Sequence, residues 1–342
     1  MKSPSAKKHK TISLVVLNYN GRQHLDEYFT SVFSQTLLPD EVIMFDNMGT
    51  DGSCEFVQEK FPSVKIITED RFNTGTALAY NTAIHHASGE YIVLQSNDIV
   101  LDTKCIAVLY KNLEADTKIG IVSSITIRYP NKKLGKFIVD QAGGLMDTYG
   151  FGMQNYPQVP VKDIPDTEEV FFAYGDSIIF RRDVFNKING LDERMFMIHD
   201  DIDLSWRMRL QGYKIIYAKH SFVYHKGSAT IGSNLDRPHI RFLSERNGIR
   251  CFIKNISPQR FIRTLPLYII LLCGEMGYFV YRGKFQLFFA DVCAILWNLW
   301  YLPETLRMRA RIQSSTKRSN VDTLFYNKSF KLMLFKNFSK SL

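Results

Sequence analysis

The chain has 342 residues, 45% of them hydrophobic and 23% charged, with a net charge of +9. This composition is that of a globular protein with a substantial core, and it excludes a disordered or fibrous chain. The five cysteines are widely spaced and form no C-x-x-C pair, so neither a disulfide framework nor a zinc site is expected, and a reducing compartment is the default.

The positive charge is concentrated in the last third of the chain. Residues 241–342 contain 17 Lys and Arg but only 5 Asp and Glu, which suggests an anionic partner, either a membrane surface or a nucleic acid. Residues 1–10 are also basic, and no apolar segment of signal-peptide length follows them. We therefore expect a disordered tail at 1–10, a main globular domain at 11–240 and a basic, apolar helical region at 241–342.

Strands and helices alternate in the first hundred residues. The predicted strands are Thr11–Leu17, Glu41–Phe45, Val64–Thr68 and Tyr91–Leu94, and the predicted helices are 23–34, 54–61 and 73–86. This alternation predicts βαβ units and an α/β fold with a mostly parallel sheet.

Polar residues follow three of these strands, at the edge where ligands bind in parallel sheets. They are Asn18 and Asn20, Asp46 and Asn47, and Asn97 and Asp98. Asn and Asp are also common turn formers, but three such groups after successive strands favour a binding site. Neither a G-x-G-x-x-G nor a G-x-x-x-x-G-K-[ST] motif is present, so a bound nucleotide would be held by carboxylates and a cation.

The second half of the predicted domain is less regular. Expected strands are Ile121–Ile127, Val170–Tyr174, Ser177–Phe180 and Lys214–Tyr217; a short helix starts at Arg181, another runs over 204–211, and 140–156 is glycine-rich and irregular. His225 follows the last strand. With the acidic strand ends upstream, it fits a cation site of mixed Asp and His ligands.

An acidic segment stands out because Asp200, Asp201 and Asp203 lie within four residues among apolar neighbours. Close carboxylates beside an apolar wall raise one another's pKa, which suits a general base or a site for a hard cation. The alternative is a solvated helix start, since first-turn carboxylates interact well with the helix dipole.

Seven motifs, in order, resemble the family 2 inverting glycosyltransferases of GT-A fold, in particular bacterial rhamnosyltransferase-type enzymes of cell-surface polysaccharide synthesis. They are Val-Val-Leu-Asn-Tyr-Asn-Gly (15–21), Asp-Asn-Met-Gly-Thr-Asp-Gly-Ser (46–53), Asn-Thr-Gly-Thr-Ala-Leu-Ala-Tyr-Asn (73–81), Gln-Ser-Asn-Asp (95–98), Gly-Asp-Ser-Ile-Ile-Phe-Arg-Arg (175–182), Gly-Leu-Asp-Glu-Arg-Met-Phe (190–196) and Asp-Asp-Ile-Asp-Leu-Ser-Trp-Arg (200–207). The resemblance covers about residues 11–250.

The resemblance implies a role for each matched position. Asp201 would be the general base, with Asp200 in place of the family's usual Glu. Asp98 and His225 would hold Mg²⁺ or Mn²⁺ on the donor diphosphate, although Ser96 stands where a full D-x-D motif has its first Asp. The implied donor-binding residues are Asn18, Asn20, Asp46, Asn47, Asn73, Gly75 and Asn97, and the implied acceptor-side residues are Gly175, Asp176 and Arg207. From its position one helical turn beyond Asp203, Arg207 could balance the acidic segment or form a simple surface ion pair.

The resemblance thus implies an enzyme that moves a sugar, with rhamnose as a candidate, from a nucleotide-diphosphate donor to a glycan or lipid-linked acceptor. Two alternatives are a nucleotidyltransferase acting on sugar phosphates and a non-enzymatic basic protein that binds nucleic acid or membranes. The first should carry a basic glycine-rich loop after strand one, which is absent. The second fits poorly with the apolar runs between the C-terminal charges, so no nucleic-acid partner is expected.

Two C-terminal segments, Leu265–Tyr281 and Phe285–Leu302, are strongly apolar but are interrupted by Glu275 and Asp291. Both fall short of the roughly 18 uncharged residues of a simple spanning helix, and aromatic and basic neighbours favour helices lying in a membrane interface. Basic residues over 307–318 would face anionic headgroups, and 324–342 is expected to be another amphipathic piece. We therefore expect a cytoplasmic enzyme at the inner membrane face. The alternative is a helical hairpin packed on the catalytic domain or, in a homo-oligomer, on a second subunit.

Overall fold

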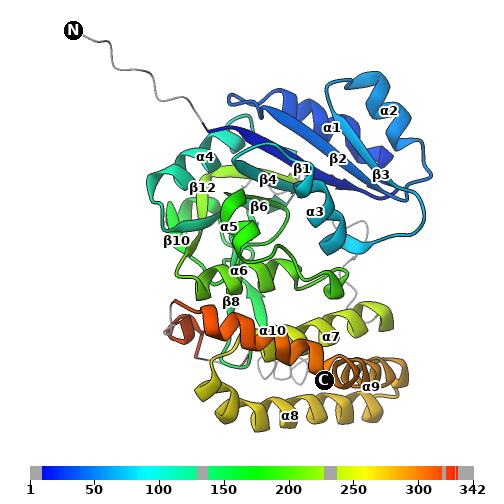
Figure 1. Cartoon of the computed structure of the whole chain (residues 1–342), viewed down its shortest axis with the longest axis vertical. Coiled ribbons are helices and arrows are strands. Elements are labelled where there is room, and N and C mark those ends of the chain that lie inside the picture. Colours follow the sequence, from blue (N-terminus) through cyan, green and yellow to red (C-terminus); the bar gives the residue numbers. More distant parts are fainter. Residues whose placement is uncertain (1–9, 129–137, 227–236, 318–320, 328, 330–342) are drawn as a thin grey trace.

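The computed structural model describes residues 10–128, 138–226, 237–317, 321–327 and 329. Its main element is a ten-stranded mixed sheet with helices on both faces (Figure 1). The N-terminal half of this sheet is parallel, in the order β3–β2–β1–β4. Its strands are β1 (Ile12–Asn18), β2 (Glu41–Asn47), β3 (Lys65–Glu69) and β4 (Tyr91–Ser96), and α1 (Arg22–Phe33), α2 (Ser53–Lys60) and α3 (Gly75–His85) connect them. The predicted α/β architecture is therefore confirmed.

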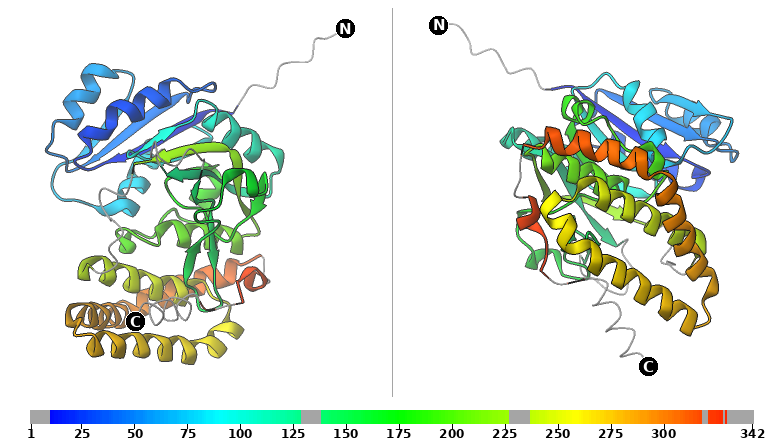
Figure 2. Two further views of the ribbon diagram at one scale, coloured as in Figure 1. Left: turned by 180° about the vertical axis from the view of Figure 1, so that it is seen from behind. Right: turned by 60° about the horizontal axis from the view of Figure 1, so that its bottom comes forward.

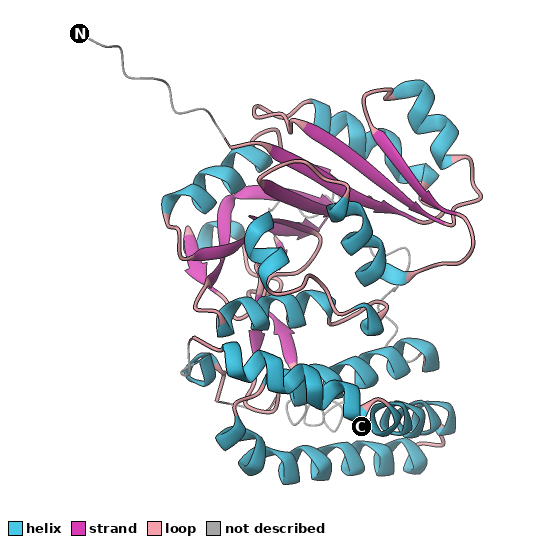
Figure 3. Ribbon diagram, viewed as in Figure 1, coloured by secondary structure: helices cyan, strands magenta, loops and turns pink. Residues whose placement is uncertain are grey.

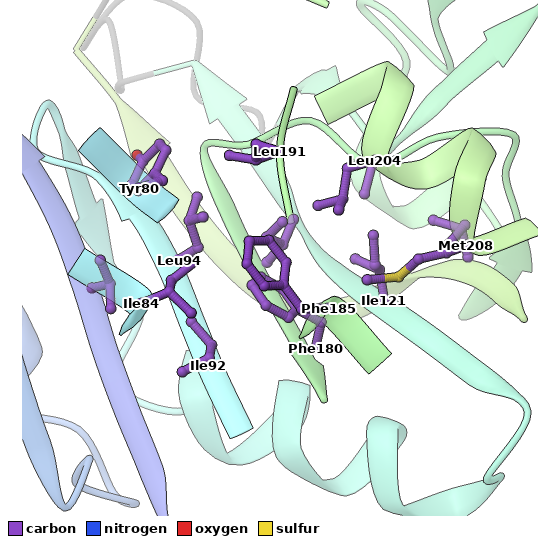
Figure 4. Close-up of a cluster of buried hydrophobic side chains, with 14 of the residues drawn as sticks. Tyr80, Ile84, Ile92, Leu94, Ile121, Phe180, Phe185, Leu191, Leu204 and Met208 are labelled. Carbon is purple, nitrogen blue, oxygen red and sulfur yellow. The ribbon is translucent and has the colours of Figure 1, made fainter. Parts of the chain in front are cut away.

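Both faces of the sheet are buried, as the continuous apolar runs of its strands require. Leu14 and Val16 of β1 pack toward α1, α2 and α4 (Cys105–Ala115), whereas Val15 packs toward α3 and α5 (Arg182–Lys187). On this second face, Tyr80 and Ile84 of α3 lie beside Leu94 of β4 (Figure 4). The period of two along β1 thus fixes which helices cover which face.

The other half of the sheet is largely antiparallel. It contains β5 (Ile99–Leu101), β6 (Ile119–Arg128), β7 (Val139–Gln141), β10 (Thr167–Glu169), β11 (Ser177–Arg181) and β12 (Lys214–His225), while β8 (Gly144–Met146) and β9 (Gly152–Gln154) form a separate pair. β11 lies antiparallel between β4 and β6, and β12 runs parallel to β6. The strand predicted at 214–217 continues to residue 225, and the segment 140–156 contains parts of three short strands.

The strand predicted at 170–174 was wrong. This segment makes one isolated bridge, between Phe172 and Gly144. The buried guanidinium of Arg209 donates to the carbonyls of Val170 and Phe171, the latter at 2.7 Å. A side chain therefore satisfies backbone groups that a neighbouring strand would otherwise have to pair.

The C-terminal helices form a separate layer below the sheet (Figures 1 and 2). They are α7 (Pro238–Asn255), α8 (Pro258–Tyr281), α9 (Phe285–Trp300) and α10 (Leu302–Ser315). Helix α6 (Asp200–Leu210) lies between this layer and the sheet (Figure 3). Leu204 and Met208 of α6 pack toward the sheet, and Ile202 and Trp206 pack toward the C-terminal layer. Of the predicted basic tail, residues 1–9 lie outside the described part of the chain, as does most of the segment predicted at 324–342.

Candidate functional site

The ends of β1 and β2 are joined by a buried hydrogen-bond chain. Asn18 Nδ2 donates to Asp46 Oδ1 at 2.6 Å, and Asn97 Nδ2 donates to Asn18 Oδ1 at 2.8 Å. The other Asp46 oxygen accepts from the backbone N–H of Gly49 at 2.9 Å. Three residues from three predicted strand ends therefore meet, because the parallel strands β2, β1 and β4 end at the same edge of the sheet.

Other predicted donor residues shape the turns at this edge. Asn47 donates to Asn73 Oδ1 at 3.0 Å and accepts from the backbone N–H of Thr74 at 2.9 Å, so its amide holds the turn before α3. Asn73 Oδ1 also accepts from the Gly75 N–H at 2.9 Å. Asn20 is exposed and accepts from the Thr50 N–H at 2.8 Å. Asn47, Asn73 and Gly75 thus position the edge of the site, whereas Asn20 stands at its surface.

Asp98 and His225, predicted to hold a metal ion, lie against each other. His225 Nε2 is 3.1 Å from Asp98 Oδ2. Burial opposes ionisation of Asp98, but the hydrogen bond and positive charge of His225 outweigh it and lower the pKa of Asp98. Burial also opposes protonation of His225, but the hydrogen bond to Asp98 and the charge of Asp176 raise its pKa to about 9.

Asp176 is next to this pair at the start of β11. Its carboxylate accepts hydrogen bonds from Thr126 Oγ1 at 3.2 Å and from Gln141 Nε2. Burial raises the pKa of Asp176, against the positive charge of His225. Asp176 is thus held by two neutral donors, and its carbonyl also accepts from the Ser96 N–H at 3.2 Å.

The acidic segment opens α6, four residues earlier than the predicted helix start. Asp200 Oδ2 accepts from Thr76 Oγ1 at 2.8 Å, and burial raises the pKa of Asp200 against this hydrogen bond. Asp201 accepts from the N–H groups of Ile202, at 2.7 Å, and Gly175, at 3.3 Å. Burial, followed by the charge of Asp200, raises the pKa of Asp201 to about 7. A carboxylate with such a pKa is suited to accept a proton near neutral pH.

Arg207 forms an ion pair within α6. Its guanidinium is buried, donates to Asp203 Oδ2 at 2.8 Å through Nε, and donates to the Ile188 carbonyl at 2.7 Å. Lys254 of α7 approaches the other Asp203 oxygen at 2.9 Å. The interpretation that Arg207 balances the acidic segment agrees with this ion pair. The alternative of a surface ion pair is wrong, because the pair is enclosed where α6 meets α7, and these contacts do not support an acceptor-side role.

One buried phenol is affected by the charges of carboxylates from both the strand edge and α6. Tyr80 of α3 donates to the Gln95 carbonyl at 3.1 Å. Burial raises the pKa of Tyr80 well above its usual value, and the charges of Asp200, Asp176 and Asp98 add to this effect. The fold therefore brings β4, β11 and α6 together around one site, although these segments are far apart in the sequence.

Asp98 and His225 are residue types that bind divalent cations, and they lie close enough to share one. In this structure His225 Nε2 and Asp98 Oδ2 bond each other at 3.1 Å, so His225 would have to lose its proton before both atoms could face an ion. Among the described residues, no three His, Cys, Asp or Glu side chains are arranged to hold a metal ion. The protein would thus supply two ligands, and phosphate oxygens of a substrate would complete the shell, as is usual for Mg²⁺.

Sequence reasoning missed several partners of these carboxylates. Thr76 lies inside the motif at residues 73–81, but the sequence predicted no role for it. No sequence pattern marks Gln141 as a site residue, because a single Gln in an irregular segment is typical of any surface loop. The contribution of α7 was also missed. Its polar residues Asn247, Arg250 and Lys254 follow a helical spacing that could have indicated one inward polar face.

Comparison with known proteins identifies the family that this sequence matches. The sequence model described as Glycosyl transferase family 2 matches residues 13–188. The N-acetylglucosaminyl-diphospho-decaprenol L-rhamnosyltransferase of Mycobacterium tuberculosis is 24% identical over 248 residues, which cover 65% of this chain and 78% of that protein. The poly-beta-1,6-N-acetyl-D-glucosamine synthase of Staphylococcus aureus is 23% identical over 264 residues, 76% of this chain and 60% of the synthase.

Solved glycosyltransferase structures share the fold. The mannosyltransferase PcManGT of Pyrobaculum calidifontis, in complex with GDP-Man and Mn²⁺, superposes with a TM-score of 0.52 at 16% identity, covering 92% of this chain and 88% of that chain. GalNAc-T7, with UDP, GalNAc and Mn²⁺, superposes with a TM-score of 0.56 at 15% identity over 72% of this chain, which spans about half (48%) of that chain. These likenesses establish the GT-A architecture.

Proposed function

We propose that this chain, which belongs to glycosyl transferase family 2, moves a sugar from a nucleotide-diphosphate donor to a hydroxyl group of a glycan or lipid-linked acceptor, with inversion at the anomeric carbon. The observation that carries this proposal is a pair of contacts at neighbouring residues. Asp201 accepts from the Gly175 N–H at 3.3 Å, and the carbonyl of the adjacent Asp176 accepts from the Ser96 N–H at 3.2 Å, two residues before Asp98. The strand edge and the start of α6 therefore face one site. A nucleotidyltransferase or nucleic-acid-binding role finds no support in the family match.

Asp201 is the proposed general base. Inversion is a single displacement, in which the acceptor oxygen attacks the anomeric carbon while the bond to the diphosphate breaks. The attacking hydroxyl must lose its proton, and a carboxylate within hydrogen-bond reach can accept it. With its pKa raised to about 7, Asp201 is a stronger base than an ordinary aspartate and is still ionised above neutral pH. Asp200 supports it by raising this pKa.

Asp98 and His225 are the proposed protein ligands of Mg²⁺ or Mn²⁺, and both solved relatives named above contain Mn²⁺. When bound, the cation would neutralise charge that develops on the leaving diphosphate. Asp46, Asn18 and Asn97 form the proposed wall for the donor nucleotide, and Gly175 and Asp176 lie on the acceptor side. His225 and Asp98 bond each other at 3.1 Å, so cation binding would replace this bond and release the proton of His225.

The relatives suggest the chemical class of the substrates. The mycobacterial relative is named for a rhamnosyl donor and a lipid-linked diphosphate acceptor, and the staphylococcal one for polysaccharide synthesis. We therefore propose synthesis of cell-surface polysaccharide, with a deoxyhexose such as rhamnose as the first donor to test.

The proposal is tested by screening nucleotide-sugars with the full chain. With Mn²⁺ present, one donor should be slowly hydrolysed or should raise the melting temperature, and EDTA should remove the effect. Asp201→Asn should keep the thermal shift and lose turnover, which separates binding from chemistry. A wild-type chain that neither hydrolyses nor binds any nucleotide-sugar with Mn²⁺ contradicts the proposal.

We also propose that the C-terminal layer lies on an anionic membrane surface, because its helices bury their charged residues in ion pairs and expose large apolar side chains. The exposed positions of α8 recur on one helical face and are mainly apolar, among them Ile262, Ile269, Ile270 and Val280. On α9 the exposed apolar positions are Phe285, Phe289, Leu296, Leu299 and Trp300. An outward apolar face of this size is typical of a membrane or protein contact.

The charged residues that interrupt these helices point inward. Arg241 of α7 bonds Glu275 of α8 at 2.6 Å and Asp291 of α9 at 2.7 Å. Within the described residues, α8 is long and apolar enough to cross a membrane, and α9 with α10 passes the same test only as a pair bent by 65°. Arg241 thus joins both helices to α7, and Tyr268 of α8 stacks on Phe252 of α7 with ring centroids 4.9 Å apart. These contacts favour a helix lying on the membrane.

Basic residues lie near the ends of this apolar face and favour an anionic membrane as its partner. Arg263, Arg282 and Lys284 are exposed at the ends of α8 and just before α9. Such positions suit anionic headgroups, and each cation near the surface contributes about 1 kcal/mol. This arrangement supports a cytoplasmic enzyme that docks on the inner membrane face, where a lipid-linked acceptor would be found.

A further inference from the structure

The loop that leads into α6 has an unusual backbone. Phe196, Ile198 and His199 all have positive φ values, of 63°, 70° and 68°. Residues other than glycine rarely adopt this region, and a β-branched residue such as Ile198 is a clear outlier there. Phe196, with ψ of −69°, also forms the centre of a tight turn in which the Met197 N–H bonds the Met195 carbonyl at 2.7 Å. Such a loop persists only when its surroundings hold it.

Asn247 on α7 provides a large part of this support. Its fully buried Nδ2 lies within hydrogen-bond distance of three loop carbonyls: those of Met195 at 2.7 Å, Met197 at 2.8 Å and Ile198 at 2.8 Å. The orientation of the amide is fixed, because its Oδ1 accepts from Arg246 Nε at 2.9 Å. One side chain from the C-terminal layer thus contacts three carbonyl groups of the strained turn. The Met195 carbonyl also accepts from the Met197 N–H and from Arg246 Nη2, both at 2.7 Å.

The opposite side of the loop contacts the donor edge. The Phe196 carbonyl accepts from the N–H groups of Thr76, at 2.6 Å, and Ala77, at 3.1 Å, at the start of α3. Gly75, with φ of +74°, permits this approach, because a Cβ there would lie 2.4 Å from the Phe196 carbonyl oxygen. The loop is therefore clamped between α3, which follows the donor-binding strands, and α7.

Asp200 and Asp201 follow this loop directly, so its shape decides where both carboxylates stand. We propose that Asn247 is a positioning residue for glycosyl transfer: it holds the strained loop 196–199 against α3 and thereby sets the place of Asp201. The inference rests on the proposed function only in naming Asp201 as the base. It gives the C-terminal layer a part in catalysis that is independent of any membrane contact.

The test compares Asn247→Ala with a matched control, Asn298→Ala, in the full chain. Asn298 is also a buried amide in the C-terminal layer, but it donates to the carbonyls of Arg246 and Ala294, both at 2.9 Å, within helices. Hydrogen–deuterium exchange should become about tenfold or more faster over residues 196–203 in Asn247→Ala, with β1 to β4 unchanged. Asn298→Ala should leave residues 196–203 as in the wild type.

Kinetics then separate positioning from loss of structure. With a donor that the wild type turns over, Asn247→Ala should lower kcat about 10²-fold and leave KM for the nucleotide-sugar nearly unchanged, because misplacing a reacting group by about 1 Å has such an effect. Unchanged exchange at 196–203, or an equal loss of kcat in both variants, overturns the inference. A wild-type chain inactive on every donor overturns the proposed function instead, and the exchange result still decides whether Asn247 holds the loop.

Discussion

Asp201 and Asp203 lie on the same turn of α6 but in opposite electrostatic environments. Asp203 contacts Arg207 at 2.8 Å and Lys254 at 2.9 Å, and these cations outweigh its burial and lower its pKa. Burial and the neighbouring Asp200 raise the pKa of Asp201. One carboxylate is thus permanently charged and joins α6 to α7, while the other can gain and lose a proton near neutral pH.

Asp201→Asn should abolish transfer without unfolding the chain. The amide keeps the size of the side chain but cannot accept a proton, so the rate should fall by about 10²–10⁴-fold. Because burial makes the ionised carboxylate unfavourable, the melting temperature at pH 8 should be equal to or higher than that of the wild type. Full transfer activity in this variant would end the assignment of Asp201 as the base.

Asp203→Asn should have the reverse effect on stability. It leaves Lys254 facing Asp192 alone, at 2.5 Å, and removes the ionic partner of Arg207 inside a buried network. Breaking a buried ion pair from one side costs about 3–5 kcal/mol, measurable by urea unfolding monitored by circular dichroism. A loss below about 1 kcal/mol would show that the network contributes little to holding α6.

The rate should depend on pH through Asp201. Its pKa in the folded protein is about 7, so the base is protonated and inactive below this pH, and kcat should fall toward about tenfold per unit as the pH decreases from 7 to 5. Asp200→Asn removes the neighbouring negative charge and should move this decline of kcat to lower pH. If kcat declines over the same pH range in Asp200→Asn as in the wild type, the decline reports the protonation of another group.

His225→Ala should weaken the use of the metal ion. Mutating a residue that only hydrogen-bonds to a metal ligand typically costs about 10–100-fold in metal affinity or activity. Loss of one of the two protein ligands should therefore raise the Mn²⁺ concentration for half-maximal activity by at least this factor. His220→Ala is the matched control, because His220 is exposed on the same strand β12. Equal Mn²⁺ dependence in both variants would exclude His225 as a ligand.

Membrane docking should depend on the outward face of α8 and α9. Ile270→Asp combined with Phe289→Asp removes two exposed apolar side chains worth about 3 kcal/mol together, so binding to vesicles of phosphatidylglycerol and phosphatidylcholine should fall about 100-fold. Leu38 of the catalytic domain is 52% exposed, compared with 63% for Ile270 and 60% for Phe289, and Leu38→Asp should bind like the wild type.

Substitution tests this face better than deletion of 260–342. Arg250 of α7 donates to Glu304 and Thr305 of α10, both at 2.8 Å, so deletion would also disturb the network around Asp192. If the wild type does not sediment with vesicles and instead forms a dimer that the same double substitution dissociates, the face is a contact between two copies of the chain.

The sequence by itself determined the parallel half of the sheet and the polar edge that follows it. The continuous apolar runs of β1 and β2 are local properties, and parallel strands bring residues such as Asn18 and Asp46 to one edge in any such fold. Only the tertiary structure decided the partners of α6. The burial of Arg207 was not predicted and Asn247 was overlooked because α6 is enclosed between the sheet and α7, and the neighbours of a side chain there depend on packing between segments about 50 residues apart.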